Sequence, residues 1–502
     1  MYKMKRFVFL MLIFCSLAGY SQNKSIWQVG KADNSPNEFA LAPNQFKAFI
    51  AHDFGYEDKF YLIGFSKEKE NFPYVLPGPA DTWGGTWPTS GWRTNQVNIL
   101  FDVQNLSVNG EYKLEIKLSD YAKKFLPLIK VSVNNYDKLI QLEAPGYDVN
   151  KQAHPKLNES FIDTLSITGN LAAATPKTIE IPIAPSVIKK GGNRVTITVL
   201  QGSWILFDQI QMDGPKSVLS NPTKLFVRHV AAANYSLTQD GKEIQPLLIN
   251  VEHLSGKPKL SVELDGKNVF NEIVESGNYE FEVPMPIVST PIRSRYKILV
   301  DHKIVEEGVI NRSKQKNQTP ADYVDTRMGT SHSRWMIGPG PWMPFSMAKM
   351  SPDNQNSGWQ AGYEPAYESI GTFSHIHEWT LGGLGVFPTN GTLKTTIGDE
   401  LKPESGYRSR IDKKSEEAPI GYYKVLLKDY NIKAEVTSTT RCGFQKYTFP
   451  KDKADSRILV DLHVPSEYDY KLKEIFIKKV SKNRIEGYAH QLSSRVWSND
   501  AD

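Results

Sequence analysis

The chain has 502 residues, with 60 Lys and Arg against 55 Asp and Glu, a formal net charge of +5, 40% hydrophobic residues and 23% charged residues. These proportions are typical of globular domains and exclude a disordered, collagen-like or coiled-coil chain. At roughly 150 residues per domain, the length predicts about three domains.

The first segment, residues 1–21, is typical of a secretory signal peptide. Lys3, Lys5 and Arg6 precede an apolar run over 7–17 and then small residues. The run is shorter than the roughly 18 residues that cross a bilayer, so we expect export to the periplasm or outside the cell, without membrane insertion of the mature chain; a membrane anchor is the alternative. Without this segment the net charge is +2, which is too small to indicate a nucleic-acid-binding protein.

Alternation of apolar and polar residues dominates the rest of the chain and predicts antiparallel strands with one face on a core. The clearest runs are 112–118, 129–133, 195–199, 260–264 and 279–283. Turn dipeptides separate such runs, namely Asn109-Gly110, Asp240-Gly241 and Asp265-Gly266. The best helical segment is Ser119 to Leu128, with Ser119 as its cap. The predicted fold class is therefore all-β.

Two segments indicate domain boundaries in the mature chain. Asp213-Gly214-Pro215 ends one strand-like stretch, and residues 311–320 form a polar, linker-like segment. We therefore expect three consecutive β-sandwich modules after the signal peptide, at 22–215, 216–318 and 319–502. Strand-like runs continue almost to Asp502, so the third module is expected to be incomplete.

An aromatic loop in the first module contains Trp83, Trp87 and Trp92 among several glycines. Flat indole faces can bind the apolar faces of sugar rings, and glycine lets a backbone approach a ligand closely. The alternative is that these three side chains plug the end of a sandwich core. The loop is thus a possible second sugar site.

The densest cluster of chemically active residues lies in the third module, where Gly and Pro density indicates long loops. His375 and His377 flank Ile376, which puts both imidazoles on one face of an extended strand. They could contact sugar hydroxyls, bond to the backbone as structural residues, or bind a metal. A metal lacks a third ligand because Glu378 points to the opposite face, and the mature chain keeps only Cys442, so we predict no metal site within this chain.

The same region resembles the N-terminal domain of glycoside hydrolase family 92, the calcium-dependent exo-α-mannosidases. The resemblance covers roughly residues 321–502. The residues that carry it follow in order: Val324-Asp325, Gly329-Thr330, Pro344-Phe345-Ser346-Met347, Ser351-Pro352-Asp353, Trp359, Gly362-Tyr363, Phe373-Ser374-His375-Ile376-His377, Gly421-Tyr422-Tyr423-Lys424-Val425, Ala434-Glu435-Val436-Thr437 and Arg441-Cys442.

The resemblance implies an inverting glycoside hydrolase, in which this sandwich contributes the wall of the sugar pocket. It also implies that a following helical barrel supplies the general acid, the general base and most calcium ligands, so we expect no catalytic residue in this chain and no activity from the chain alone. The expected partner is an α-mannoside-like glycan. The substrate-binding residues predicted within the cluster are Trp359, His375, His377, Asp353, Glu378, Trp379, Arg334 and Trp335.

The first module is similar to the carbohydrate-binding-like jelly-roll domain of rhamnogalacturonan lyases. The matching residues are Ile26-Trp27-Gln28-Val29-Gly30, Glu38-Phe39 and Trp204-Ile205-Leu206-Phe207-Asp208. This similarity favours an alternative function, a glycan-binding protein without enzymatic activity. A weaker alternative is an accessory protein for pectin-directed lyases.

Overall fold

The computed structural model describes residues 23–45, 59–78, 96–123, 126–143, 166–216, 218, 225–253, 256–315, 319–328, 330, 338–354, 362–365, 367–377, 381–382, 384–400, 402–452, 455–462, 471–492 and 500–501. These residues form sheets with very little helix, so the predicted all-β class is confirmed. Each described sheet draws its strands from only one of the ranges 22–215, 216–318 and 319–502. We call these ranges the first, second and third modules.

The first module packs two sheets face to face. One has the order β1-β10-β5-β8, with β3 beside β10, and the other has the order β2-β4-β9-β6-β7. Apolar residues that alternate along β5 and β9 meet in one core between the sheets. The strands are β1 Asn23–Gly30, β2 Lys59–Leu62, β3 Val75–Leu76, β4 Gln96–Val103, β5 Tyr112–Tyr121, β6 Leu128–Val133, β7 Tyr136–Gln141, β8 Lys177–Ile183, β9 Gly191–Gln201 and β10 Ile205–Pro215, with helix α1 at Glu68–Asn71 and a 3₁₀ turn at Pro185–Val187.

The second module is a smaller sandwich. Its sheets have the orders β11-β13-β12, with β16 beside β13, and β15-β14-β17-β18. Its core contains buried Leu, Ile and Val side chains from both sheets. The strands are β11 Leu225–Ala232, β12 Leu237–Gln239, β13 Lys242–His253, β14 Lys259–Leu264, β15 Lys267–Ile273, β16 Gly277–Pro286, β17 Ile292–Val300 and β18 Lys303–Arg312.

The third module contains a sheet of order β19-β21-β24-β29, a sheet of order β20-β25-β26-β27-β28, a small β22-β23 pair and a terminal β30-β31-β32 sheet. Its core lies between the first two sheets. The elements are β19 Ser351–Asp353, β20 Ser369–Ile370, β21 Thr372–Ser374, β22 Ile376–His377, β23 Leu381–Gly382, β24 Gly385–Thr389, β25 Ser409–Glu417, β26 Tyr423–Leu427, β27 Ile432–Ser438, β28 Gly443–Thr448, β29 Arg457–Asp461, β30 Lys471–Ser481, β31 Arg484–Leu492 and β32 Asp500–Ala501, with 3₁₀ turns at Pro320–Tyr323 and Pro403–Ser405.

The helix predicted from Ser119 to Leu128 is wrong. Strand β5 runs through Ser119 to Tyr121, and the Ser119 hydroxyl donates to the Phe207 carbonyl of β10 at 3.0 Å. Pairing with β10 therefore overrides the local capping signal. Two of the turn predictions are confirmed, because Asp240 and Asp265 have φ of +49° and the glycines after them are also left-handed. No helix among the described residues is long and apolar enough to cross a membrane.

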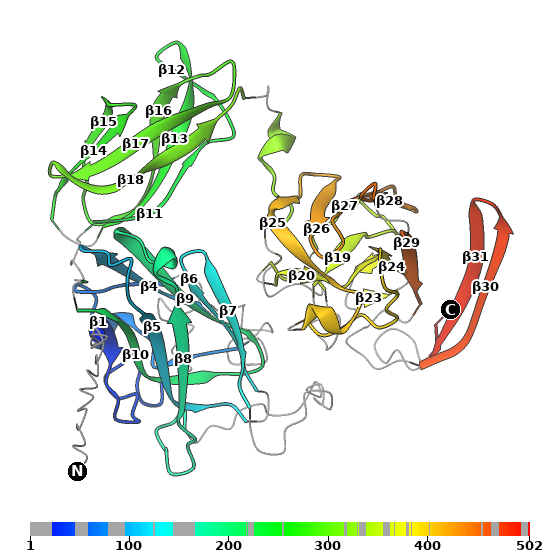
Figure 1. Ribbon diagram of the computed structural model, residues 1–502, viewed down its shortest axis with the longest axis horizontal. Coiled ribbons are helices and arrows are strands. Elements are labelled where there is room, and N and C mark those ends of the chain that lie inside the picture. Colours follow the sequence, from blue (N-terminus) through cyan, green and yellow to red (C-terminus); the bar gives the residue numbers. More distant parts are fainter. Residues whose placement is uncertain are drawn as a thin grey trace, which may run out of the picture.

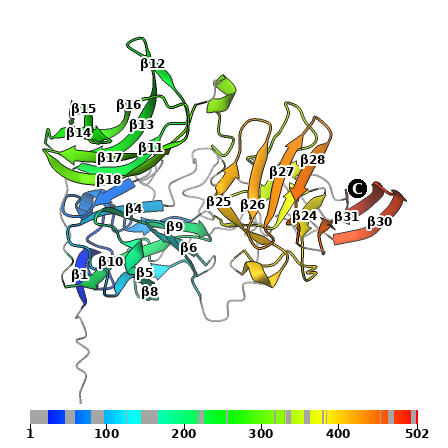
Figure 2. The same ribbon diagram turned by 45° about the horizontal axis from the view of Figure 1, so that its top comes forward.

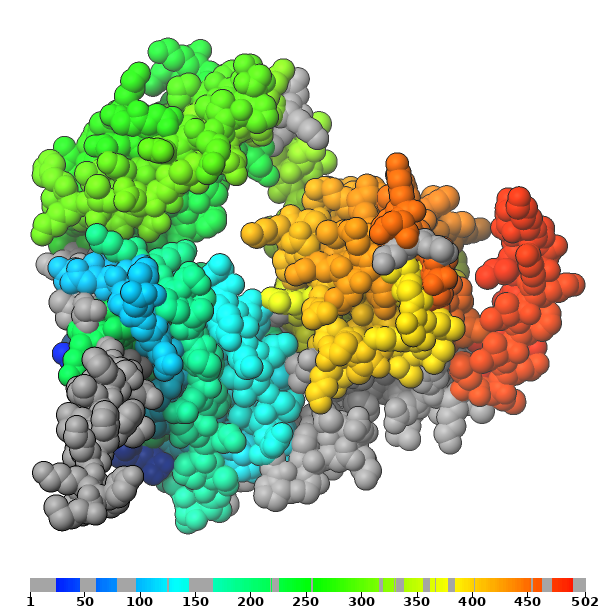
Figure 3. All heavy atoms as spheres, viewed as in Figure 1, coloured from blue at the N-terminus to red at the C-terminus, as the bar shows by residue number. Residues whose placement is uncertain are grey.

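The first module lies next to both of the others (Figures 1 and 2), and buried side chains make contact with each of them. Phe226 of the second module is buried against Leu62 and Leu100 of the first. On the side of β6 and β9, Tyr367 of the third module packs against Leu128 and Leu200 of the first module. The hairpin of β30 and β31 projects at the far end of the third module (Figure 3).

Candidate functional site

The candidate site is built on one face of the short ribbon formed by β19 and β21. Ser351 lies opposite Ser374, and Asp353 lies opposite Thr372, so their side chains share one face. All four residues are buried. Phe373, between the two β21 residues, points the other way into the hydrophobic core. Period-two alternation therefore gives this ribbon one apolar face and one buried polar face.

Asp353 and His377 form the centre of this polar face. Asp353 Oδ1 lies 2.7 Å from His377 Nε2, and both side chains are 0% exposed. His377 Nδ1 donates to the Lys349 carbonyl at 2.6 Å, because a carbonyl oxygen can only accept. The short contact with Asp353 then requires one proton between Nε2 and Oδ1. Ser374 Oγ adds a third contact to the ring, 3.1 Å from Nε2.

Two polar atoms of the same face lack hydrogen-bond partners within the described part of the chain, namely Asp353 Oδ2 and Thr372 Oγ1. A buried acceptor of this kind suits a water or a small polar ligand. Asp353 and Thr372 beside His377 offer too few oxygen atoms to hold calcium, which takes six to eight oxygen ligands. Across the described ranges, no three His, Cys, Asp or Glu side chains gather closely enough to hold a metal ion.

Trp342 covers the imidazole of His377. The two ring centroids are 5.9 Å apart with an interplanar angle of 27°, which is a stacked arrangement. The indole N–H donates to the Met350 carbonyl at 2.7 Å, and Lys349 Nζ lies 5.6 Å from the indole centroid. The indole is thus held by its hydrogen bond to Met350 and by contacts with a buried imidazole and an ammonium group.

His375 lies nearer the surface than His377. Its Nδ1 donates to the Leu384 carbonyl at 2.5 Å, and its Nε2 lies 3.2 Å from Gln445 Nε2, which can donate to it. Burial lowers the pKa of His375 and outweighs the opposing effect of the Leu384 carbonyl. These contacts describe a neutral ring with its proton on Nδ1.

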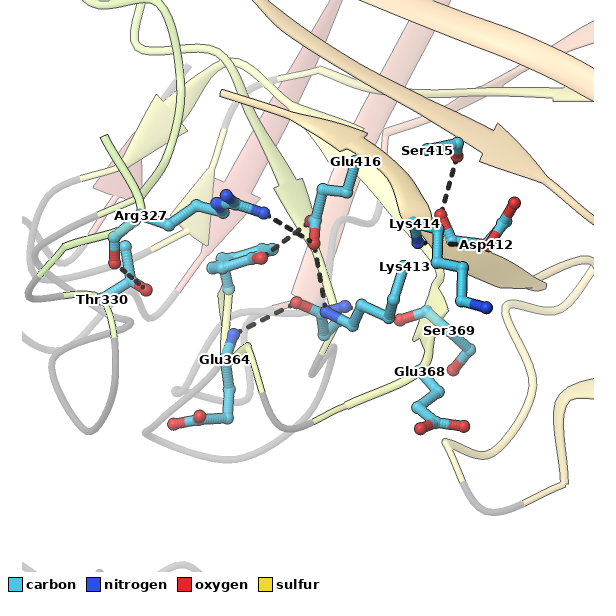
Figure 4. A network of polar contacts seen from close by, with 12 residues as sticks. Arg327, Thr330, Glu364, Glu368, Ser369, Asp412, Lys413, Lys414, Ser415 and Glu416 are labelled. Atoms are coloured by element: carbon cyan, nitrogen blue, oxygen red, sulfur yellow. Dashed lines mark hydrogen bonds and ion pairs between the residues drawn. The ribbon is translucent and has the colours of Figure 1, made fainter. Parts of the chain in front are cut away.

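A second buried network supports the segment that precedes β20. Glu416 Oε1 accepts hydrogen bonds from the hydroxyls of Tyr363 and Tyr423, each at 2.7 Å. Its other oxygen lies 3.4 Å from Lys413 Nζ and 3.7 Å from Arg327 Nη1, and the two cations approach the carboxylate from different directions (Figure 4). The Glu416 side chain is 2% exposed, and its charge is offset by Lys413 and Arg327, whose side chains are 31% and 34% exposed.

The structure brings three of the predicted site residues together, Asp353, His375 and His377. The other predicted residues lie outside the described residues, namely Trp83, Trp87, Trp92, Arg334, Trp335, Trp359, Glu378 and Trp379. Sugar contact stays a prediction for all of them. Five residues of these networks are not among the predicted site residues, namely Lys349, Thr372, Ser374, Gln445 and Glu416. The alternation of polar residues in Thr372–Ser374 is a signal that indicates Thr372 and Ser374.

Two parts of the chain match known protein families. Residues 323–500 match the glycosyl hydrolase family 92 N-terminal domain. Residues 25–212 match polysaccharide lyase family 4, domain III, a carbohydrate-binding-module-like domain. Both matches confirm the resemblances predicted from sequence.

Individual relatives agree over part of the chain. An uncharacterized secreted glycosidase of Arthroderma benhamiae is 30% identical over 154 residues, which cover 28% of this chain and 19% of that protein. A family 92 alpha-mannosidase from Bacteroides thetaiotaomicron is 28% identical over 34% of this chain and 24% of its own, with a TM-score of 0.31. This chain thus spans about a fifth to a quarter of these relatives' length. What the comparisons show for the chain itself is a match to a glycosyl hydrolase family 92 N-terminal domain that follows a match to a polysaccharide lyase-type domain.

Proposed function

We propose that the chain is part of an exported glycoside hydrolase that resembles the calcium-dependent inverting exo-α-mannosidases. In this proposal residues 319–502 contribute the wall of a pocket for an α-mannoside. The observation that carries it is the match of residues 323–500 to the family 92 N-terminal domain. Export is supported by the signal-like residues 1–21 and by the relative described as a secreted glycosidase.

Within the pocket wall, the described residues take two roles. His375 is partly exposed and its Nδ1 is held by the Leu384 carbonyl, so we assign its Nε2 a direct contact with a sugar hydroxyl, which would take the place of the Gln445 amide there. His377 and Asp353 are fully buried and act beneath the wall by fixing Trp342 and the strand ends. Because the resemblance puts the general acid, the general base and most calcium ligands in a barrel, we expect residues 1–502 to bind a mannoside without hydrolysing it.

The proposal is tested on the full chain by calorimetric titration with methyl α-mannoside and an α-linked mannobiose. We expect His375→Ala to weaken binding about two- to tenfold, as for one neutral hydrogen bond. His229→Ala, an exposed histidine of the second module, is the matched control and should leave affinity unchanged. Absence of binding to every α-mannoside, or equal loss in both variants, would overturn the proposal. Release of nitrophenol from a nitrophenyl α-mannoside, with or without calcium, would contradict the expected inactivity.

A second function is favoured by the lyase-type match over residues 25–212. In that case the chain is a glycan-binding protein that acts through the loop of Trp83, Trp87 and Trp92. A glycan array that includes mannosides and rhamnogalacturonan separates the two functions. Binding that is lost in Trp87→Ala and unchanged in His375→Ala would support the second function, and a preference for rhamnogalacturonan would favour the accessory role toward pectin.

A further inference from the structure

We propose that the first module positions the candidate site of the third module, with Lys130 and Gln201 as the positioning residues. They hold the short segment 367–369, which is bonded in turn to the neighbours of Asp353. The inference about the segment stands on the contacts alone, and its consequence for glycan affinity rests on the proposed function.

The apolar part of the contact is centred on Tyr367. This side chain is 1% exposed and packs with Leu128 of β6 and Leu200 of β9, while Leu139 lies against the same cluster. The Gln201 side-chain amide donates to the Tyr367 hydroxyl. A buried tyrosine whose hydroxyl is satisfied by another module is fixed at both its apolar body and its polar end.

The polar part of the contact joins Lys130 to the next residue, Glu368. Lys130 Nζ lies 3.4 Å from Glu368 Oε1 and 3.4 Å from Asp137 Oδ2 of the adjacent strand. The Asp137 carboxylate also accepts from the Ser132 hydroxyl at 2.5 Å. Lys130 is only 15% exposed, so its ammonium group is held against these two carboxylates with little freedom to move away.

From this segment, hydrogen bonds lead directly to the site. The Ser369 carbonyl accepts from Asn354 Nδ2 at 2.7 Å, and the Ser369 hydroxyl accepts from Arg408 Nη1 at 2.8 Å. Arg408 Nη2 donates to the Asn354 carbonyl at 3.0 Å. Asn354 follows Asp353 in the chain, and Gly371 N donates to the Asp353 carbonyl at 2.9 Å.

All members of this last group are buried. Asn354 is 0%, Arg408 1% and Ser369 2% exposed. A buried donor that loses its acceptor cannot readily bond to bulk water instead. If residues 367–369 shift, Asn354 and Arg408 must therefore shift with them, or their side-chain N–H groups lose the Ser369 acceptors. The placement of β19, and with it of the Asp353 carboxylate beside His377, therefore depends on the sheet of the first module.

The test uses the full chain carrying both Lys130→Met and Gln201→Ala, with Lys138→Met as the control. Lys138 is an exposed lysine of β7, in the same sheet. Hydrogen–deuterium exchange of the amides of Lys349, Asn354 and Gly371 is measured, since these donate to carbonyls around the site. We expect their exchange to accelerate about two- to thirtyfold in the double variant, the range of typical long-range coupling. Peptides of β13 in the second module should exchange at the wild-type rate in both variants.

Exchange that changes only at residues 367–369, with the amides of Asn354 and Gly371 at wild-type rates, would overturn the proposal, because it would show a local interface without a positioning effect. Affinity for methyl α-mannoside is measured in parallel, and we expect the double variant to lose affinity while Lys138→Met does not. If exchange accelerates around the site and the wild-type chain binds no α-mannoside, the positioning proposal is upheld and the proposed function is the one that fails.

Discussion

Asp353 and His377 lie 24 residues apart in the chain, yet Asp353 Oδ1 lies 2.7 Å from His377 Nε2. Both side chains are fully excluded from solvent. The pair shares one proton, because the other ring nitrogen of His377 already donates to a backbone carbonyl. The buried pair fixes the imidazole under Trp342 and joins β19 to β22.

Removing the acid of this pair should be costly. In Asp353→Ala, the His377 ring keeps its bond to the Lys349 carbonyl and loses its carboxylate partner at a position that is 0% exposed. We expect the free energy of unfolding to fall by about 3–5 kcal/mol, as when one partner of a buried ion pair is deleted. Denaturant titration measures the change. Asp452→Ala, at an exposed turn, should stay within about 0.5 kcal/mol of wild type; a similarly small effect for Asp353→Ala would contradict the pairing.

Two adjacent glutamates of β25 offer a matched comparison. Glu416 is buried and bonded to Tyr363 and Tyr423, whereas Glu417 is 58% exposed and pairs with Lys424 at the surface. We expect Glu416→Gln to lower the free energy of unfolding by about 3–5 kcal/mol, because Lys413 and Arg327 lose their buried counter-charge. Glu417→Gln should cost no more than about 1 kcal/mol. Equal effects of the two changes in a denaturant titration would refute the assigned network.

The side chain of Asp102 in β4 should make stability depend on pH. Burial raises its pKa to about 6, and the same carboxylate contributes to the raised pKa of Glu306 in the second module. A raised pKa means that folding favours the protonated acid, so the stabilisation is complete below the ordinary pKa of 3.8 and is lost as pH rises through about 6. The melting temperature, followed by calorimetry from pH 4 to 7.5, should therefore fall less in Asp102→Asn than in wild type. The exposed control Asp455→Asn should reproduce the wild-type curve, and an identical curve for Asp102→Asn would contradict the shift.

The first and second modules should unfold together through Phe226. This side chain is 4% exposed and lies against Leu62 and Leu100 of the first module. We expect Phe226→Ala to destabilise the chain by about 3–5 kcal/mol, the usual cost of removing a buried phenyl ring. In calorimetry the transition of the second module should separate from that of the first. Phe444→Ala, at a 57% exposed position of β28, should leave the thermogram unchanged; a single unaltered transition in Phe226→Ala would argue against coupling.

The sequence by itself determined the features that depend on local backbone geometry. Alternating apolar residues such as Leu114, Ile116 and Leu118 predicted a strand, and Asp265-Gly266 predicted the left-handed turn that joins β14 to β15. Ordered motifs from Val324 to Cys442 were enough for the family 92 resemblance, since a motif keeps its spacing whatever it packs against. These signals extend over a few residues and can be read without knowing the partner of each strand.

Contacts between distant residues were decided by the tertiary structure alone. Ser119 lies in a strand because β10 offers its Phe207 carbonyl, although the local pattern favoured a helix cap. The sequence predicts His377 and Asp353 as separate sugar contacts, and the tertiary structure joins them into one buried pair between β22 and β19. Gln201 and Tyr367 are 166 positions apart, and no periodicity links them. Burial and hydrogen bonding across such distances depend on how whole sheets pack, so the sequence specified which residues were available and the packing selected which of them meet.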